Sequence, residues 1–329
     1  MTPSAARASV AVLDVLSPAS REQVLETFGN RFDVVFNDGS DGAKKRIAEG
    51  ATALLAGWDR VDADVISSAR VCKVIQKLGV GTDKIDVEAA RQGRIAVLRA
   101  AGVNSEAVAE MAILLTLAVL RRLVPAVNAV RVGRMAKEEL RATAYQLMGR
   151  TVGVVGAGHI GRAAARRFAA FDTTLIYFDV TRLTSEVEHQ LGMTYLELDE
   201  LVATSDIVTL HLPLTEETRH VLDRRLLARM KPSAVLVNTA RGGLVDEAAL
   251  IEALASGALL GAGLDVTQDE PVSPGSPLLA LENVIVTPHY AAAVADNLPR
   301  VLRHAYRNVT SVLDGTPVSP EDVVWWPET

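Results

Sequence analysis

Three glycines in the stretch TVGVVGAGHIGRAAARRF, residues 151–168, have the spacing of a phosphate-binding turn. The run TVGVV is predicted to form a buried strand, and the residues after the third glycine have the composition of a helix. In that setting Gly156 permits a tight turn, Gly158 lets the backbone approach a pyrophosphate, and Gly161 lets helix and strand pack closely. The stretch therefore predicts a dinucleotide site, with the diphosphate at the helix N-terminus.

An acid that completes this pattern follows at the end of the next predicted strand. The run TTLIYFDV places Asp179 there, 18 residues after Gly161 (179 − 161). A carboxylate at this point accepts hydrogen bonds from the ribose hydroxyls and repels a 2′-phosphate, so it favours NAD over NADP. Arg182 lies close enough in the sequence to weaken that preference. Since strand, turn, helix and acid agree, a glycine cluster without a ligand is the less favoured interpretation.

Three further residues have the types that an alcohol-oxidising nicotinamide enzyme needs. Such an enzyme uses a base for the hydroxyl proton, a partner for that base, and a cation for an acidic substrate or a developing oxyanion. Arg241, Glu270 and His289 lie in the segments VNTARGGLVDEAAL, GAGLDVTQDEP and NVIVTPHYAAA. Each follows a predicted strand, and open α/β sheets bind ligands at the carboxyl ends of their strands. Taken singly, they are also ordinary as a surface arginine, a turn acid and a packed histidine.

The elements that must position these residues form two series of alternating strands and helices. The first series has predicted strands at 10–13, 34–36, 53–55, 74–78 and 95–98, and the second at 152–155, 175–178, 207–210, 234–237, 262–264 and 284–286. Alternation of this kind predicts parallel sheets covered by helices on both faces. The fold class is therefore α/β with two units in succession.

Two helices outside this alternation bear on the domain organisation. A long helix is predicted from Asn104 or Ser105 to Leu123, with Glu106 in its first turn. A last amphipathic helix, about 292–313, comes too late to extend the second sheet, and we expect it to return to the first unit. The tail VVWWPET holds Trp325 and Trp326, which we expect to pack on the first unit as well.

Composition limits the classes of partner. The chain has 329 residues, of which 49% are hydrophobic and 22% charged, which fits two globular cores. The chain has a net charge of −6 and no long run of like charge. We therefore expect neither nucleic acid nor an anionic membrane as a partner. The most apolar helical stretch, 111–120, is shorter than the roughly 20 residues of a membrane span. No histidine pair has metal-site spacing, so no metal is expected.

Cysteine usage and the start of the chain predict a cytoplasmic location. Cys72 is the one cysteine, so no intrachain disulfide can form, and its apolar surroundings in VCKVIQKLGV predict a buried thiol. The first apolar run, SVAVLDVL, carries an acid and lacks the basic-then-apolar order of a signal peptide.

Longer motifs in a fixed order identify a family. The segments LGVGTDKIDVEAA at 78–90, NSEAVAE at 104–110 and SDIVTLHLPLTEET at 205–218 join those above. Over nearly its whole length the chain resembles the D-isomer-specific 2-hydroxyacid dehydrogenase family, which includes glyoxylate/hydroxypyruvate reductases and D-3-phosphoglycerate dehydrogenases. The resemblance implies two Rossmann-like, doubly wound domains. A flavodoxin-like substrate domain would comprise 1–103 and 292–329, and an inserted NAD-binding Rossmann domain would comprise 104–291.

The same resemblance implies NAD-dependent interconversion of a small 2-oxoacid and its D-2-hydroxyacid in an interdomain cleft. His289 would be the acid/base and Glu270 its partner, while Arg241 would grip the substrate carboxylate and polarise the carbonyl. Backbone donors around Val80 and Gly81 would hold the other side of the carboxylate. The cofactor-binding set that we expect is Gly156, Gly158, His159, Ile160, Gly161, Asp179, His211, Pro213, Thr239, Ala240, Arg241, Asp265 and His289.

Several alternatives stay open at this point. His159 fits a phosphate contact or a solvent-facing helix start, and His211 fits the cofactor cleft or a packed strand end. An NAD-binding sensor, similar to the corepressors of the same family, and a phosphite dehydrogenase are the alternatives to the oxoacid enzyme. A homodimer is expected, although Met135 replaces the tryptophan that many relatives have in an element linked to dimer contact.

Overall fold

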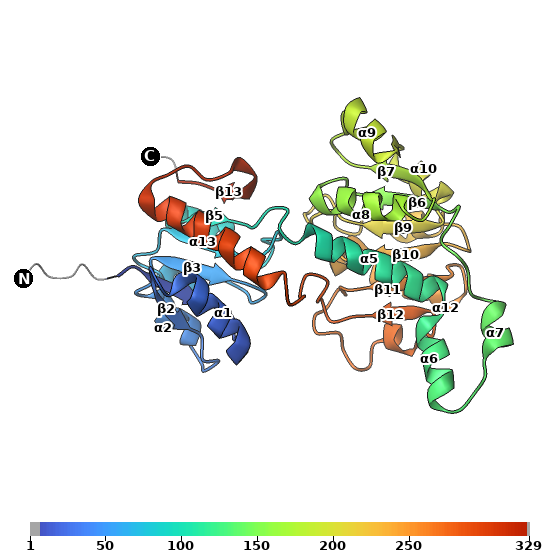
Figure 1. Cartoon of the computed structure of the whole chain (residues 1–329), viewed down its shortest axis with the longest axis horizontal. Helices are drawn as coiled ribbons and strands as arrows, with labels where there is room; N and C mark the ends of the chain where they lie inside the picture. The colour runs from blue at the N-terminus through green and yellow to red at the C-terminus, as the bar shows by residue number, and fades with distance from the viewer. Residues whose placement is uncertain (1–6, 328–329) are drawn as a thin grey trace, which may run out of the picture. The chain divides into compact units, whose positions relative to one another are not determined.

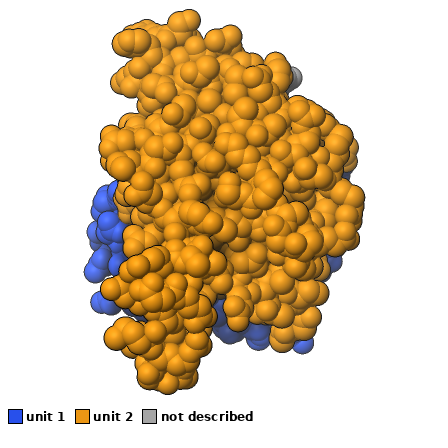
Figure 2. Space-filling view, turned by 90° about the vertical axis from the view of Figure 1, so that its right-hand side faces the viewer, with its two compact units in different colours: residues 1–104, 294–329 blue, residues 105–293 orange. Residues whose placement is uncertain are grey.

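A computed structural model describes residues 7–327, which form two compact units (Figures 1 and 2). Unit 1 contains the described residues up to Asn104 and those from Val294 onward, and unit 2 contains Ser105–Ala293. Figure 2 shows unit 1 in blue and unit 2 in orange. Unit 1 is thus built from both ends of the chain, and unit 2 is one continuous segment between them.

Unit 1 is a six-stranded sheet with helices on both faces. The strand order is β13-β5-β4-β3-β1-β2, in which β1 to β5 are parallel and β13 is antiparallel to β5. Its strands are β1 (Ser9–Val12), β2 (Asp33–Phe36), β3 (Ala53–Ala56), β4 (Val74–Lys77), β5 (Ala96–Leu98) and β13 (Val323–Trp325). Its helices are α1 (Pro18–Phe28), α2 (Ala43–Ala48), α3 (Ala63–Ser68), α4 (Val87–Gln92) and α13 (Leu298–Asp314), with a 3-10 turn at Pro320–Asp322. The order of the first five strands, 2-1-3-4-5, is that of flavodoxin-like sheets.

Each face of this sheet buries one apolar cluster. On one face, β-strand residues pack against Phe28 of α1 and Leu302 of α13, and on the other they pack against Val65 of α3 and Ala90 of α4. Short polar side chains begin the helices: the carboxylates of Asp62 and Asp86 accept backbone N–H groups in the first turns of α3 and α4. Strands that are apolar on both sides therefore form the middle layer, as parallel sheets require.

The C-terminal segment is part of unit 1 and lies beside elements from the other end of the chain. In Figure 1 the red α13 lies alongside the blue α1, and the rings of Tyr306 and Phe28 meet edge to face with centroids 5.4 Å apart. The buried carboxylate of Asp322 pairs with His304 Nε2 at 2.7 Å and accepts the backbone N–H of Ala101 at 2.9 Å. Trp325, in β13, pairs with β5 and packs on the unit 1 core, as predicted, whereas Trp326 is 41% exposed and the prediction for it was wrong.

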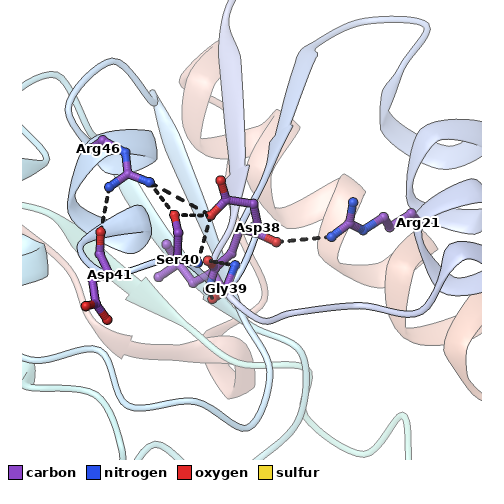
Figure 3. A network of polar contacts seen from close by, with 8 residues as sticks. Arg21, Asp38, Gly39, Ser40, Asp41 and Arg46 are labelled. Atoms are coloured by element: carbon purple, nitrogen blue, oxygen red, sulfur yellow. Dashed lines mark hydrogen bonds and ion pairs between the residues drawn. The ribbon is translucent and has the colours of Figure 1, made fainter.

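A network of polar contacts holds the loop after the edge strand β2 (Figure 3). The Asp38 carboxylate accepts both the N–H and the hydroxyl of Ser40, at 2.9 and 2.6 Å. Arg46 of α2 donates to Ser40 Oγ and to the carbonyl of Asp41, each at 2.6 Å. Gly39 takes a positive φ of 81° in this loop, a conformation that side chains disfavour. These contacts fix the turn between β2 and α2.

Unit 2 is a seven-stranded, fully parallel sheet in the order β12-β11-β10-β9-β6-β7-β8. Its strands are β6 (Thr151–Val155), β7 (Thr174–Phe178), β8 (Met193–Tyr195), β9 (Ile207–Leu210), β10 (Val235–Asn238), β11 (Gly261–Leu264) and β12 (Val284–Val286). Its helices are α5 (Ser105–Leu120), α6 (Leu123–Arg131), α7 (Lys137–Arg141), α8 (His159–Ala169), α9 (Ser185–Leu191), α10 (Leu198–Thr204), α11 (Arg224–Leu227) and α12 (Glu247–Ala255), with 3-10 turns at Gly242–Leu244 and Pro277–Ala280. The order is that of a Rossmann sheet with one strand added.

Helices cover both faces of the second sheet. Buried side chains of α5 and α8 belong to one apolar cluster, and those of α10, α11 and α12 belong to the other. α5 is the most apolar of these helices, and Leu115 and Val119 on it are buried. It lies against β11 at two glycines: a Cβ at Gly263 would come 2.8 Å from Leu115 Cβ, and one at Gly261 the same distance from Val119. Small residues on the strand therefore let this helix approach the sheet closely.

Two predicted helices have different ends in the structure. α5 stops at Leu120 rather than Leu123, because Arg122 takes a left-handed φ of 51° and a new helix, α6, begins after it. α13 begins at Leu298 rather than at 292, with Pro299 in its first turn, where a missing N–H costs nothing. The strands β8 and β13 were not predicted. Within residues 7–327, no helix combines the length and the apolar character that a membrane crossing requires.

Candidate active site

The glycine turn lies where the strand order of the second sheet reverses, between β6 and β9. Gly156 follows β6 with φ at +96°, and a Cβ there would come 2.8 Å from the carbonyl carbon of His211, which follows β9. A Cβ at Gly161 would come 1.9 Å from the carbonyl oxygen of Gly156. Both positions therefore exclude any side chain. Gly156 does so because of its positive φ and its contact with the His211 backbone, and Gly161 because α8 lies so close to the turn.

Gly158 differs from its two neighbours in the motif. It is exposed, precedes the first residue of α8, and a Cβ built on it would meet nothing within 4 Å. His159 and Ile160 form the first turn of the 11-residue α8, whose leading N–H groups attract an anion. Glycine is not needed here for the protein's own packing, whereas a close backbone approach to a ligand explains it. The turn thus fits a dinucleotide phosphate.

Asp179 lies directly after β7 and is tied to the same turn. Its Oδ2 accepts the backbone N–H of Ala157 at 2.7 Å, and its Oδ1 accepts that of Thr181 at 3.0 Å. These bonds hold the half-buried carboxylate beside the glycine turn. Each carboxylate oxygen has a second lone pair, so the group can also accept ribose hydroxyls. The position fits the acid that a nicotinamide dinucleotide requires.

His211 begins the segment after β9 and is neutral. Its Nε2 lies 3.0 Å from the buried Thr209 hydroxyl, and its Nδ1 is buried with no hydrogen-bond partner among the described residues. Burial lowers the pKa of this imidazole to about 4. Pro213, two residues on, is exposed. The backbone of His211 lies close to Gly156, so the histidine stands at the edge of the sheet that carries the glycine turn.

Asn238, the last residue of β10, shapes the turn that carries Arg241. The Asn238 amide donates to the Arg241 carbonyl at 2.8 Å and accepts the N–H of Ala240 at 3.0 Å. Within this turn the Thr239 hydroxyl is buried and has no partner among the described residues. Arg241 is half-buried and donates to the Ala240 carbonyl at 2.6 Å. The backbone of the arginine is therefore fixed by a buried side chain at the end of β10.

The imidazole of His289 pairs with the carboxylate of Glu270. Nδ1 lies 2.9 Å from Glu270 Oε2, and the two side chains are 42% and 26% exposed. His289 has a left-handed φ of 50°, which is uncommon for a residue other than glycine. Strained backbone of this kind persists only where neighbouring contacts hold it, and it concentrates at functional sites.

Asp265 supplies those contacts. It follows β11, is 1% exposed, and its carboxylate accepts the Thr287 hydroxyl at 2.6 Å and the N–H groups of Tyr290 and Ala291 at 3.1 and 2.9 Å. Its carbonyl oxygen accepts the N–H of His289 at 2.8 Å. One buried acid thus holds the segment on both sides of the histidine.

The structure gathers the predicted residues of unit 2 at the carboxyl edge of one sheet. The glycine turn, Asp179, His211, Arg241, Asp265 and His289 follow β6, β7, β9, β10, β11 and β12 in turn, and Glu270 reaches His289 from the loop after β11. Val80 and Gly81 are half-buried residues after β4 in unit 1, at the carboxyl edge of that sheet. Their role in binding a substrate stays a prediction.

Asn238 and Thr287 were missed by the sequence reasoning. Asn238 could have been found from the sequence, because asparagine is rare in strands and common in turns, and here it directly follows an apolar run. Thr287 had no such signal. Across the described part of the chain, no group of three histidine, cysteine or acidic side chains could hold a metal ion.

Comparison with known proteins places this geometry in a family. Residues 113–291 match the family model described as D-isomer specific 2-hydroxyacid dehydrogenase, NAD binding domain. A glyoxylate reductase of Thermofilum pendens is 39% identical over 291 residues, 86% of each chain. A hydroxypyruvate reductase of Thermotoga maritima is 38% identical over 263 residues, 79% of this chain and 84% of its own.

A solved structure agrees. The crystal structure of a glyoxylate reductase from Paecilomyes thermophila superposes with a TM-score of 0.81 at 29% identity, over 96% of this chain and 99% of its own. The glycine turn and Asp179 lie within the matched segment, and so do Arg241, Glu270 and His289. The chain therefore belongs to the D-isomer-specific 2-hydroxyacid dehydrogenase family, and it contains that family's NAD-binding domain.

Proposed function

We propose that this protein reduces a small 2-oxoacid, such as glyoxylate or hydroxypyruvate, to the 2-hydroxyacid with NADH, giving the D isomer where the product is chiral, and catalyses the reverse reaction with NAD. The observation that carries the proposal is the pair of His289 Nδ1 and Glu270 Oε2, 2.9 Å apart, on a strained backbone that Asp265 holds. Relatives named as glyoxylate and hydroxypyruvate reductases support this substrate class. When bound, the nicotinamide supplies or accepts the hydride at C2 of the substrate.

In this proposal each site residue has one task. Because Glu270 engages Nδ1 of His289, Nε2 is the nitrogen that we assign to proton exchange with the substrate oxygen. Arg241 binds the substrate carboxylate through two parallel N–H groups, which suits its planar fork. Backbone N–H groups at Val80 and Gly81 bind the carboxylate as well.

We further propose NAD as the preferred cofactor. The Asp179 carboxylate lies beside the glycine turn, where it accepts N–H groups at 2.7 and 3.0 Å. A ribose diol can donate to such a carboxylate, whereas a 2′-phosphate would be repelled by it. Residues of this chain therefore favour the unphosphorylated dinucleotide.

A homodimer is proposed through the segment around α6 and α7, which Figure 1 shows projecting from the body of unit 2. Val130 and Val132 are 74% and 71% exposed there, and Met135 is 92% exposed. Apolar side chains gathered on one exposed segment are typical of an interface between subunits. A cytoplasmic location is supported by Cys72, a buried free thiol.

Initial rates of cofactor oxidation test the function. We would incubate the purified chain with NADH or NADPH and, in turn, glyoxylate, hydroxypyruvate, pyruvate, phenylpyruvate and 2-oxoglutarate. We expect NADH-dependent turnover of glyoxylate, of hydroxypyruvate, or of both. Tight NADH binding without turnover of any oxoacid would point instead to a sensor, and NAD reduction by phosphite would point to phosphite oxidation.

A further inference from the structure

The arginine that follows Asp179 in the sequence forms an ion pair with a second acid. Arg182, three residues after Asp179, donates from Nε to Glu188 Oε1 at 2.9 Å and from Nη2 to Oε2 at 3.2 Å. This is a two-point pairing of a planar guanidinium with a carboxylate, the same geometry with which arginine grips a phosphate. The pairing holds the pKa of Glu188 below its usual range. Both groups are therefore ionised and directed at one another.

Glu188, on α9, is held in this position by the sheet beneath it. The hydroxyl of Tyr177, a fully buried residue of β7, donates to Glu188 Oε1 at 2.8 Å. The same hydroxyl accepts the backbone N–H of Leu183 at 2.9 Å. Glu188 is 15% exposed, whereas Arg182 is 64% exposed. The acid is thus the fixed partner of the pair, and the arginine is the partner that can move.

The arginine is supported from a second side as well. Its guanidinium lies 5.3 Å from the ring centroid of Tyr195 on β8, and that ring meets Tyr177 edge to face at 5.5 Å. A guanidinium over an aromatic face is attracted by the ring quadrupole. Arg182 is therefore held on the α9 side of the loop after β7 by its contacts with Glu188 and Tyr195. Tyr177 in turn contacts both of these residues.

We propose that Glu188 is a cofactor-selectivity residue, because it holds Arg182 away from the position in which an arginine would bind a 2′-phosphate. In dinucleotide sites, NADP is accommodated by an arginine near the end of the second strand, and NAD by an acid there. This chain has both residues, Asp179 and Arg182, and the pairing with Glu188 decides which of them acts. The inference rests on the proposed nicotinamide site and adds a second barrier to NADP beside the repulsion from Asp179.

Equilibrium binding of the two reduced cofactors tests this directly. The fluorescence of NADH and NADPH, titrated with protein, gives a dissociation constant for each without any substrate. The test variant is Glu188→Gln, which removes the charge and keeps an oxygen for the Tyr177 hydroxyl. We expect the dissociation constant for NADPH to fall about two- to five-fold, the range set by an exposed ion pair, while that for NADH stays unchanged.

Three variants separate release of the arginine from other effects. Glu186→Gln, on the exposed face of the same helix, removes an equal charge without touching Arg182, and we expect no gain in NADPH binding. In the double variant Arg182→Ala with Glu188→Gln the gain should vanish. Arg182→Ala alone, at an exposed position, should leave NADPH binding unchanged, since the paired arginine contributes nothing to it.

Several results would overturn this inference and leave the proposed function intact. These are an unchanged NADPH constant in Glu188→Gln, an equal gain in Glu186→Gln, or weaker NADPH binding in Arg182→Ala, in each case with normal NADH binding. Failure of the unaltered chain to bind either cofactor would instead refute the proposed function, and the inference with it. The two failures are therefore distinct.

Discussion

The carbonyl oxygen of Asp265 accepts the backbone N–H of His289 at 2.8 Å, while the Asp265 carboxylate binds the residues on either side of that histidine. The acid is buried and follows β11, and the histidine follows β12, the neighbouring strand of the sheet. A core residue thus fixes the backbone of the proposed acid/base. A site residue holds a precise position only when such supporting contacts fix it.

Replacement of Asp265 by asparagine should loosen this segment. The amide would present N–H₂ toward one of the two N–H groups that the carboxylate now accepts, leaving a buried donor without an acceptor. We expect a loss of about 1–3 kcal/mol in the free energy of unfolding and a lower kcat. Urea denaturation and steady-state kinetics measure both. Thr287→Val, which removes one hydroxyl donor and creates no opposed donors, is the control, and equal losses in the two variants would contradict the argument.

Arg241→Lys should separate geometry from charge. Lysine retains the positive charge but cannot make two parallel N–H contacts with a carboxylate. We expect kcat/KM for the oxoacid to fall about 10- to 100-fold, the equivalent of one charged hydrogen bond, with NADH affinity retained. Stopped-flow rates and fluorescence titration give the two quantities. A variant as active as the original chain would remove Arg241 from the substrate site.

The glycines of the turn should respond to alanine in different ways. Gly161→Ala places a Cβ where the Gly156 carbonyl now lies, 1.9 Å away, so we expect about 1–3 kcal/mol of lost stability. Gly158→Ala meets no protein atom within 4 Å, so we expect normal stability but weaker NADH binding. Thermal unfolding and cofactor titration distinguish these outcomes. Unchanged NADH affinity in Gly158→Ala would place the dinucleotide elsewhere.

The buried imidazole of His211 should make stability depend on pH. Its pKa is lowered to about 4 in the folded chain, whereas an unfolded histidine titrates near ~6.5. Between these values the unfolded chain binds the extra proton, so the free energy of unfolding falls as pH falls from about 6.5 toward 4, by at most about 1.4 kcal/mol per pH unit. Above about pH 6.5 the imidazole is neutral in both the folded and the unfolded chain, so it no longer makes the free energy of unfolding depend on pH.

Urea denaturation at pH 5 and pH 7 checks this for the original chain and for His211→Asn. The asparagine has no proton to gain, so its stability should change less between the two pH values. Equal changes in both proteins would show that His211 is not a buried neutral group.

Much of the fold followed from the sequence because parallel strands buried on both faces appear as short, continuous apolar runs. All eleven predicted strands are present, and no strand end is shifted by more than one residue. β8 was missed because its sequence, Met-Thr-Tyr, is not a continuous apolar run, and β13 was missed because its antiparallel pairing with β5 joins distant parts of the chain. A strand of this kind is defined by its neighbour rather than by its own pattern.

The site was predictable to the extent that it rests on local motifs. The glycine turn and Asp179 belong to one strand-helix-strand unit, so their spacing alone carried the prediction. The supports of the site come from elsewhere in the chain. The contacts of Asp265 span 22 to 26 residues, and Glu188 is placed by a tyrosine on another element. Such pairs are set by tertiary packing, which one sequence does not display.

Activity of His289→Gln tests the central claim most directly. NADH oxidation with hydroxypyruvate would be followed for this variant and for the original chain, with NADH binding measured on both. Glutamine keeps a polar side chain of similar size but cannot exchange a proton. The account predicts that NADH binding is retained while kcat falls by about 10²- to 10⁴-fold, the usual contribution of a positioned acid/base. Near-normal kcat in His289→Gln would contradict the assignment of His289 as the acid/base.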